Sequence, residues 1–593
     1  MPRTRHPAVN EKPGYQLMKV ALGEAEADLA IVNGNILNVY TGEVLTADTV
    51  LVKGNRIAYV GKNAQQSIST NTEVIDAEGK TLIPGLIDGH THANFVYSVS
   101  EMMKYALKGG TTAVITEAID FAVNLGYQGV IEFLRSLKNQ PMKVFIAVPP
   151  MVTISPVVRE HSLTRHELRK LLKRKEVIGL GECYWGPTIE GDRQLLDYIT
   201  EARMSGKKID GHTTGARDNK LQGYASLGIS SCHEPTTVDE VLERLRLGMF
   251  VLIREGETRR ELEAVAGIKD ENIDFRQLGV STDGVGPWQI TTDGYMEFVV
   301  QKAIDLGFNP VQAIQMATIN IAQHFGLDDS IGGIAPGKCA DIVIIPNLTT
   351  IQAECVISNG RVVARDGQLL VQPRKHTYPR STQNVIRLPK SLTADDFAVR
   401  IDSQRRKVKV RVIDQVSDLI TREAIIELPV SNGLVLPDAD SDILKVAAIE
   451  RTYLPGKTFV GFIRGLRFKR GAMATTAVWD TSDIIVAGTN EADMAQAVNR
   501  IGELNGGIVI CAGGKILAEM ALPISGMLSL QPVEAISQQL HHIQQVAETF
   551  GCPWPDIRLT LCVLTTGAIP FLRMCEEGLF DLRQNSLVPL IVD

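Results

Sequence analysis

Pro84-Gly85-Leu86-Ile87-Asp88-Gly89-His90-Thr91-His92 is the stretch that decides the fold of this chain. Leu86 and Ile87 continue an apolar strand that runs into two histidines. Because side chains alternate along a strand, His90 and His92 point to the same side. Two imidazoles on one side of a strand end can bind one metal ion. The alternative is a surface strand with two solvated histidines. Further metal-ligating residues at other strand ends would favour the metal site over this alternative.

The middle of the chain, residues 84–330, alternates predicted strands and helices. Strands are expected at 86–92, 111–116, 143–148, 177–182, 208–212, 229–234, 249–254 and 279–283. Helices are expected between most of them, at 96–108, 120–137, 163–174, 193–205 and 236–247. This pattern predicts a (β/α)8 barrel. An open doubly wound sheet is the alternative, and it is less favoured because no GxGxxG follows the first strand.

The segments that flank the barrel are both β-rich. Residues 1–20 read as a leader with a short helix, and short strands separated by glycines follow up to residue 83. A similar run of short strands recurs within 331–375. Two such pieces around a long middle predict one small β-sandwich built from both, with the barrel inserted between them.

The last part of the chain, residues 376–593, reads as a separate α+β domain. A polar linker at 374–389 precedes several strand-like stretches, and helices are expected at 490–504 and 532–549. Gly513-Gly514 is interpreted as a hairpin turn. A phosphate-binding loop is not favoured there, because no helix opens after the glycines.

Composition restricts the class of protein. A chain of 593 residues is too long for one core, so several domains are expected. The net charge of −7 argues against nucleic-acid or anionic membrane surfaces as partners, and no apolar run is long enough to span a membrane. The eight cysteines lack CxxC spacing, which is typical of buried thiols in a reducing compartment. The N-terminus has no apolar signal core, so the cytoplasm is the expected location.

Metal-ligating side chains stand at the ends of five of the eight predicted strands. They are His90, His92, Glu182, His212, His233 and Asp283. The carboxyl ends of barrel strands meet at one mouth, so these side chains are expected to converge there. A lone histidine is more often a core residue, but six such groups in strand order predict a metal site.

This arrangement resembles the amidohydrolase superfamily, which has HxH on strand 1, a bridging Lys or Glu on strand 4, His on strands 5 and 6, and Asp on strand 8. The phrase Gly333-Ile334-Ala335-Pro336-Gly337-Lys338 is also similar to that superfamily. Within it, the chain resembles adenine deaminases of the bacterial two-metal type along nearly its whole length. The motifs that carry this likeness are Gly211-His212-Thr213-Thr214-Gly215, Ser231-Cys232-His233-Glu234, Ile253-Arg254-Glu255-Gly256 and, in the last domain, Gly461-Phe462-Ile463-Arg464-Gly465 and Leu522-Pro523-Ile524-Ser525-Gly526.

The resemblance implies a cofactor and a reaction. Glu182 at the bridging position implies two divalent metal ions that lower the pKa of a shared water, with Mn or Fe expected and Zn as an option. Asp283 is expected to take the proton of that water. Glu234 is expected either to protonate a ring nitrogen as general acid or to orient His233. The partner is a small heterocyclic substrate, and a homo-oligomer is expected.

Four further residues are candidates for substrate binding. Arg254 and Glu255 stand at the end of strand 7, where a salt bridge at the rim is the alternative. Tyr184 and Trp185 follow Glu182, and ordinary packing is the alternative for these aromatic residues.

The chain departs from the family pattern at positions expected to face substrate. Ala93-Asn94-Phe95 replaces the usual Ile-Glu-Ser, Gly284 replaces an acid, and Trp479-Asp480-Thr481-Ser482-Asp483 replaces His-Asp-Ser-His-Asn. After Glu182 the chain has Cys183-Tyr184-Trp185 in place of Met-Met-Asn. Because Gly284 is expected to leave room, the hypothesis is a 6-aminopurine deaminase that prefers an N6-alkyl adenine. The alternatives are hydrolysis of a cyclic amide, such as a hydantoin or lactam, and a non-catalytic metal-dependent assembly protein.

Overall fold

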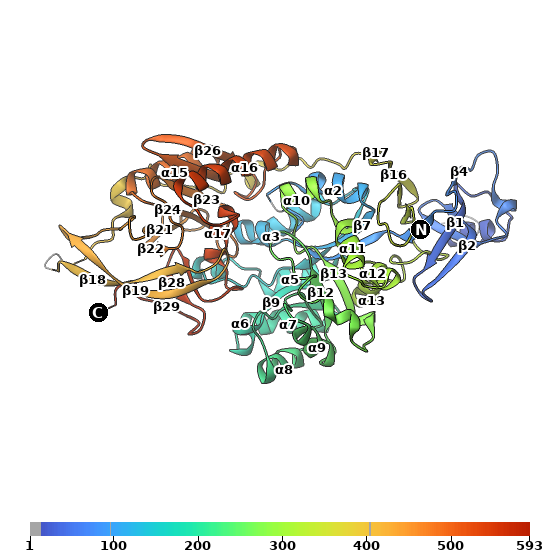
Figure 1. Cartoon of the computed structure of the whole chain (residues 1–593), viewed down its shortest axis with the longest axis horizontal. Coiled ribbons are helices and arrows are strands. Elements are labelled where there is room, and N and C mark those ends of the chain that lie inside the picture. The colour runs from blue at the N-terminus through green and yellow to red at the C-terminus, as the bar shows by residue number, and fades with distance from the viewer. Residues whose placement is uncertain (1–12, 95, 402–404, 593) are drawn as a thin grey trace, which may run out of the picture.

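Three parts of the chain lie in a row along the long axis of the molecule (Figure 1). The structure is a computed structural model, and it describes residues 13–94, 96–401 and 405–592. The barrel occupies the centre, with the N-terminal sheet at one side and the C-terminal part at the other. Most of the predicted leader (residues 1–12) and Phe95 lie outside the described residues, and the first described helix is α1 (Pro13–Ala21).

The central part is an eight-stranded sheet in which every neighbouring pair is parallel. Its strands are β6 (Leu86–Thr91), β7 (Thr111–Glu117), β8 (Lys143–Val148), β9 (Val177–Tyr184), β10 (Lys208–His212), β11 (Ser231–Cys232), β12 (Phe250–Arg254) and β13 (Leu278–Ser281). The last strand returns to the first, because the amide of Asp283 donates to the carbonyl of His90 at 3.0 Å. Asp88 tightens this closure by accepting from the amide and the hydroxyl of Thr282. The predicted (β/α)8 barrel is therefore confirmed.

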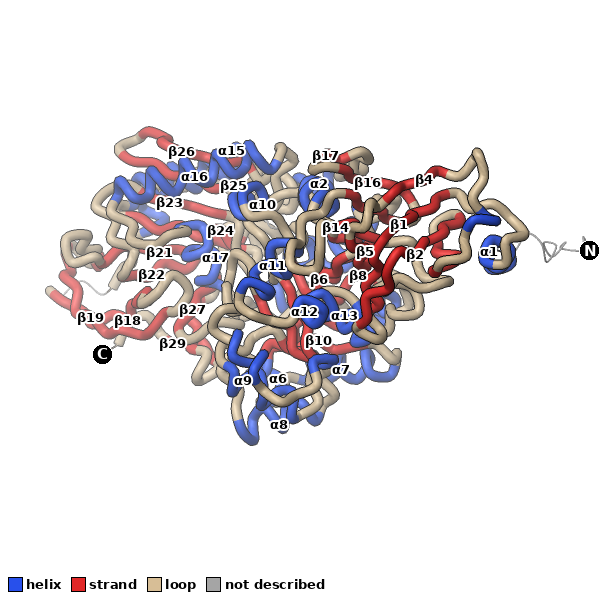
Figure 2. Tube along the Cα trace, turned by 45° about the vertical axis from the view of Figure 1, so that its right-hand side comes forward, coloured by secondary structure: helices blue, strands red, loops and turns tan. Residues whose placement is uncertain are grey.

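Helices pack around the barrel strands (Figure 2). They are α2 (Val99–Lys108), α3 (Ile119–Ser136), α4 (Pro156–Glu160), α5 (Arg165–Leu172), α6 (Trp185–Ile189), α7 (Arg193–Met204), α8 (Asp218–Ser226), α9 (Val238–Arg246), α10 (Pro287–Thr292), α11 (Met296–Asp305), α12 (Pro310–Met316) and α13 (Ile319–Phe325). The helix predicted at 163–174 begins at Arg165 because Thr164 caps it, together with Glu167, in a capping box. The helix predicted at 120–137 contains a kink at Gly126, where φ is +55°.

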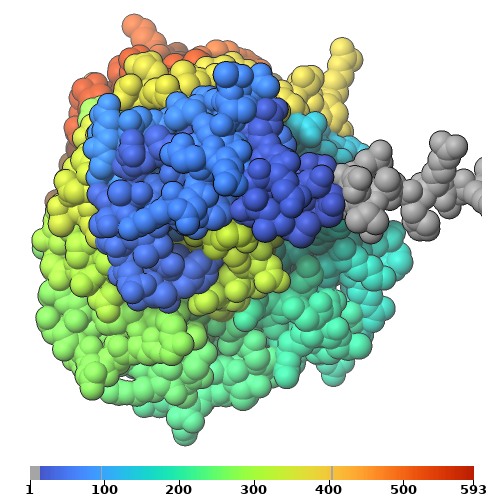
Figure 3. Space-filling view, turned by 90° about the vertical axis from the view of Figure 1, so that its right-hand side faces the viewer, coloured from blue at the N-terminus to red at the C-terminus, as the bar shows by residue number. Residues whose placement is uncertain are grey.

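The two flanking β pieces join in one nine-stranded sheet. Its strands are β1 (Leu29–Asn38), β2 (Glu43–Lys53), β3 (Arg56–Gly61), β4 (Glu73–Asp76), β5 (Thr81–Pro84), β14 (Ile342–Ile345), β15 (Cys355–Ser358), β16 (Arg361–Arg365) and β17 (Gln368–Leu369). The two pieces meet where β5 pairs with β14, for example Ile83 opposite Val343. Figure 3 shows both pieces on one face of the molecule, in blue and yellow-green. The sandwich expected from the sequence is therefore one continuous sheet by its hydrogen bonding, and β5 leads through Gly85 into the first barrel strand.

The C-terminal part carries a second nine-stranded sheet and a small three-stranded one. The larger sheet contains β18 (Lys407–Gln415), β19 (Thr421–Ser431), β20 (Leu434–Val435), β21 (Ile443–Glu450), β22 (Thr458–Arg464), β23 (Ala472–Thr475), β24 (Asp483–Gly488), β25 (Gly507–Ala512) and β26 (Lys515–Ala521). The smaller one contains β27 (Leu572–Cys575), β28 (Gly578–Asp581) and β29 (Ser586–Val588), and the helices are α14 (Arg380–Gln383), α15 (Glu491–Leu504), α16 (Val533–Phe550) and α17 (Ile557–Cys562). Gly513 and Gly514, with φ of +57° and +78°, connect β25 to β26, as the hairpin interpretation predicts.

Buried polar contacts attach this part to the barrel. Arg451, fully buried, donates to Asn124 on α3 at 2.9 Å, and the hydroxyl of Tyr453 donates to the carbonyl of Val123. The predicted linker at 374–389 also contacts the barrel part, because Arg374 donates to the carbonyl of Lys138. These contacts place loops of the C-terminal part over the barrel mouth. Within the described residues, no helix combines the length and the apolar character that a membrane span requires.

Candidate metal centre at the barrel mouth

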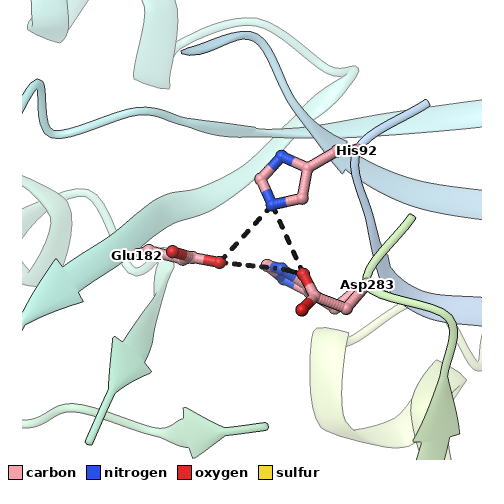
Figure 4. A group of neighbouring side chains, drawn as sticks. His92, Glu182 and Asp283 are labelled. Atoms are coloured by element: carbon pink, nitrogen blue, oxygen red, sulfur yellow. Dashed lines mark ion pairs between the residues drawn. The ribbon is translucent and has the colours of Figure 1, made fainter. Parts of the chain in front are cut away.

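The six side chains predicted at the strand ends converge in the structure. They reach the mouth from five strands and the turns that follow them: His90 from β6, His92 directly after β6, Glu182 from β9, His212 from β10, His233 after β11 and Asp283 after β13. Asp283 has φ of +53°, a left-handed conformation that an ordinary residue seldom adopts. That backbone turn aims its carboxylate back toward the two histidines of β6, as Figure 4 shows for His92.

Two overlapping groups of ligand atoms share Glu182. In the first group, Nε2 of His90 lies 3.0 Å from Glu182 Oε1 and 3.4 Å from Asp283 Oδ1. Nε2 of His92 completes it, 3.4 Å from the same Asp283 oxygen. The second group joins Glu182, His212 and His233, and Nε2 of His233 lies 3.2 Å from Glu182 Oε1. One carboxylate between two sets of imidazoles is the arrangement that a pair of divalent ions requires.

Unpartnered nitrogens test whether these residues fit a metal. Nε2 of His90 and both ring nitrogens of His233 are buried and make no hydrogen bond in the described structure. Buried polar atoms are normally satisfied, so unpaired imidazole lone pairs call for an explanation. Neutral imidazole and carboxylate together suit Mn, Fe or Zn. The donor set therefore fits divalent metal ions.

Asp210 fixes the orientation of His90. Its Oδ2 lies 2.8 Å from His90 Nδ1, which leaves Nε2 facing the other ligands. Asp210 is itself held by the hydroxyl of Ser231 at 2.9 Å and by the amide of Gly211 at 3.0 Å. A carboxylate behind a ligating histidine sets the tautomer and increases the basicity of the ligand nitrogen.

The cluster carries strongly shifted pKa values. Burial lowers the pKa of His90, but the carboxylates of Asp210, Asp283 and Glu182 raise it well above its ordinary value. Burial likewise raises the pKa of Asp283, and the surrounding histidines and Arg254 hold it well below its ordinary value. The structure thus favours an ionised carboxylate at Asp283.

Arg254, at the end of β12, connects the two acids assigned to proton transfer. Its Nη1 donates to Glu234 Oε1 at 2.6 Å and to Asp283 Oδ2 at 3.0 Å. Its Nε and Nη2 donate to both oxygens of Glu261, at 2.8 and 2.9 Å. Burial raises the pKa of Glu234, but Arg254 and His212 hold it well below its ordinary value. The guanidinium is buried and forms ion pairs with Glu234, Asp283 and Glu261. The salt bridge considered as the alternative therefore forms, inside the mouth and not on an exposed rim, and it orients these acids.

A cavity of about 140 Å³ opens above the cluster. Its barrel walls include His92, Glu182, His212, Glu234, Arg254 and Asp283 together with Tyr184. Its opposite wall comes from the C-terminal part and includes Ile420, Trp479, Asp480, Thr566, Ile569 and Pro570. Apolar walls with a few converging polar groups are typical of a small-molecule site.

The residues predicted to bind substrate divide into two groups. Tyr184 and Arg254 line the cavity, whereas Glu255 and Trp185 do not. Glu255 is fully buried and accepts from Lys302 at 2.8 Å, because its side chain turns away from the mouth. The indole of Trp185 donates to the carbonyl of Thr214, and Lys220 of α8 lies over its ring.

The glycine expected to leave room for a substituent on the substrate also lies outside the cavity lining. Gly284 has φ of +100°, which a residue with a side chain rarely adopts, and it is not among the described residues that line the cavity. Trp479 does line it. The N6-alkyl preference therefore stays a prediction that rests on Trp479 alone.

Three acids near the mouth were not predicted as site residues. Asp210 stands two residues before His212 on a strand, and this spacing could have revealed it. Glu117 ends β7 and accepts the amide of Glu182 at 2.6 Å, so its place at a strand end was also a signal. Burial and the nearby carboxylate of Glu182 raise the pKa of Glu117 to about 8. Asp480 comes from the C-terminal part, where the strand-end rule for barrels does not apply.

Comparisons with known proteins find relatives along nearly the whole chain. The amidohydrolase family model matches residues 81–363, and the adenine deaminase C-terminal domain matches residues 418–586. An adenine deaminase of Moorella thermoacetica is 35% identical, over 97% of this chain and 98% of its own length. Adenine deaminase 3 of Rhizobium meliloti is 34% identical, over 97% of this chain and 98% of its own. Among solved structures, a D-hydantoinase from Thermus sp. superposes with a TM-score of 0.45 at 17% identity, covering 58% of this chain and 96% of its own.

Proposed function

The chain belongs to the adenine deaminase family of amidohydrolases, hydrolases that act on carbon–nitrogen bonds, and from that premise we propose that it hydrolyses the 6-amino group of adenine. The products are hypoxanthine and ammonia. The observation that carries the proposal is the convergence of four histidines, Glu182 and Asp283 beneath a cavity that the adenine-deaminase-type C-terminal domain closes. Hydrolysis of a cyclic amide is not favoured, because the full-length relatives are adenine deaminases.

The two groups of ligands would hold two divalent ions, with Glu182 shared between them. His90, His92 and Asp283 would complete one position, and His212 and His233 the other. Mn or Fe is the expected metal, and Zn also suits this donor set. When bound, the ions supply Lewis acidity that makes water available as a nucleophile near neutral pH.

Asp283 would act as the general base. Its Oδ1 faces the ligand nitrogens of His90 and His92, while Arg254 holds its Oδ2. Arg254 thereby fixes the direction of the carboxylate and keeps it ionised, ready to take a proton from the attacking water. Positioned proton transfer of this kind typically contributes about 10²–10⁴-fold in rate.

Glu234 would deliver a proton to a ring nitrogen of the purine. It lines the cavity and accepts from Thr214 as well as Arg254, and these donors favour its ionised form. An ionised Glu234 must first receive a proton before it can donate one. Because Arg254 donates to both Glu234 and Asp283, the two acids are held together at one edge of the cavity.

Product analysis tests the function. Protein loaded with Mn should release ammonia from adenine and produce hypoxanthine, and chelation should abolish both. N6-methyladenine, measured on the same preparation, reports on the predicted preference for a decorated substrate through the ratio of the two kcat/KM values. A preparation with bound metal that releases neither ammonia nor methylamine would refute the deaminase proposal.

The remaining predictions concern location and assembly. All eight cysteines are buried and free, which supports a reducing compartment such as the cytoplasm. The homo-oligomer expected from the family resemblance stays a prediction.

A further inference from the structure

Asp480 reaches the active-site cavity from outside the barrel. It lies in the loop between β23 and β24, with φ of +63°, and only 3% of its surface is exposed. Its backbone carbonyl accepts from the hydroxyl of Thr153 in the barrel at 2.5 Å. The carbonyl of the preceding Trp479 accepts from Thr565 at 2.5 Å. The loop is therefore fixed at both residues that face the cavity.

Donors surround the Asp480 carboxylate unevenly. Oδ2 accepts from the hydroxyl of Thr566 at 2.5 Å, the amide of Gly567 at 3.2 Å and the hydroxyl of Tyr184 at 3.1 Å. Oδ1 has only the same Tyr184 hydroxyl, at 3.3 Å. Among the described residues, no lysine or arginine forms an ion pair with Asp480. Oδ1 thus retains acceptor capacity, and a buried carboxylate without a cation is costly unless hydrogen bonds satisfy it.

Tyr184 connects this acid to the candidate metal centre. Its ring lies edge-on to the imidazole of His212, with centroids 5.1 Å apart, while its hydroxyl reaches Asp480. Asp480 and the ligands therefore face the same cavity from opposite walls. A fused bicyclic ring whose six-membered half lies over the ligands would direct its five-membered half toward the C-terminal wall.

We propose that Asp480 is the substrate-recognition residue of this site and that its Oδ1 accepts the N–H of the five-membered ring of adenine. The inference rests on the proposed deaminase function. Adenine carries one such N–H in either ring tautomer, so one acceptor serves both. The C-terminal domain then supplies the contact that selects a purine, while the barrel supplies the groups for hydrolysis.

Methylated substrates test this contact. Wild type, Asp480→Ala and Asp480→Asn are compared on adenine, 7-methyladenine and 9-methyladenine, each protein loaded with Mn. Loss of one buried hydrogen bond should raise KM for adenine about ten- to a hundredfold in Asp480→Ala, with a smaller change in kcat. The amide oxygen of Asp480→Asn still accepts a hydrogen bond, so the KM of this variant for adenine should lie between those of wild type and Asp480→Ala. Neither 7-methyladenine nor 9-methyladenine has an N–H on the five-membered ring, so in wild type both should lose a similar factor relative to adenine. Asp480→Ala should remove most of that difference.

The controls separate recognition from structure. Metal content should be unchanged in both variants, and Asp493→Asn, a buried acid of the same domain outside the cavity, should behave as wild type on all three compounds. If Asp480→Ala does not fold, the same comparison of the three substrates on Asp480→Asn tests the recognition role. An equal loss on adenine and on both methylated compounds would overturn the recognition role. A wild type that releases no ammonia from adenine would refute the deaminase function itself, whatever the variants do.

Discussion

At both ends of the barrel a buried histidine carries a ring nitrogen without a hydrogen-bond partner: His90 at the mouth and His324 at the opposite end. His324, on α13, stacks on Phe250 with ring centroids 4.3 Å apart, and Phe250 is the first residue of β12. Burial lowers the pKa of His324 to about 3, helped by Lys208. His90 is also buried, yet three carboxylates raise its pKa well above the ordinary value.

The difference lies in the neighbours and not in the burial. His324 is packed between aromatic rings and has no carboxylate within ion-pair distance among the described residues. It is a neutral core residue. His90 faces Glu182 and Asp283 and is backed by Asp210, so its lone pair points into a cluster of anions. Such a cluster of anions attracts cations, and this makes the mouth, and not the base, the candidate metal site.

The largest expected effect is at the mouth. Asp283→Asn keeps the size of the side chain and can still contact metal, but it cannot take a proton. Turnover of adenine should fall about 10²–10⁴-fold, while metal content stays close to that of wild type. Steady-state kinetics and metal analysis of the same sample check this. Near wild-type turnover would remove Asp283 from the role of base.

A smaller effect is expected one contact behind the ligands. Asp210→Asn weakens the partner of His90 Nδ1, and such losses typically cost about 10–100-fold in metal affinity or activity. Titration with a competing chelator measures the affinity. Ser231→Ala, which removes only a donor to Asp210, is the matched control and should cost less. If Asp210→Asn binds metal as tightly as wild type, Asp210 is not what orients His90.

The smallest effect on activity is expected at the base of the barrel. His324→Leu should leave kcat and metal content unchanged, but it should alter stability in acid. In wild type the pKa of His324 is about 3 in the folded chain against 6.5 for the unfolded reference, so the unfolded chain binds more protons between these values. Stability contributed by this residue therefore falls as pH drops below about 6.5, by up to about 1.4 kcal/mol per pH unit.

Chemical denaturation at several pH values measures this slope. His324→Leu should flatten it between about pH 6.5 and 3. The exposed His166 on α5 is the control, and His166→Gln should keep the wild-type slope. Loss of metal in His324→Leu would contradict the distinction between the two ends of the barrel.

Sequence patterns predicted the barrel and the convergence of six candidate ligands because both depend on local rules. Strand alternation places His90 and His92 on one side, and the strand-end rule collects Glu182 and Asp283. Side-chain direction beyond a strand end follows no such rule, which is why Glu255 turned out to bind Lys302 and to lie outside the cavity. The room expected at Gly284 likewise depended on a loop conformation that the sequence does not specify.

Local sequence rules do not predict the opposite wall of the cavity, and only the family resemblance placed Trp479 and Asp480 among the positions expected to face substrate. Asp480 and Tyr184 are nearly three hundred residues apart and meet only because the C-terminal part docks on the barrel through buried contacts such as Arg451 with Asn124. Docking of this kind depends on the complementarity of two folded surfaces, so local spacing does not indicate the contact between Asp480 and Tyr184.

Anomalous diffraction from crystals of the Mn-loaded protein, recorded at the Mn edge, tests the central claim most directly. Two peaks are predicted at the barrel mouth, about 3.5–4 Å apart. One should lie among His90, His92 and Asp283 and the other between His212 and His233, with Glu182 bound to both. A single peak, or peaks away from Glu182, would contradict a two-metal centre at this mouth.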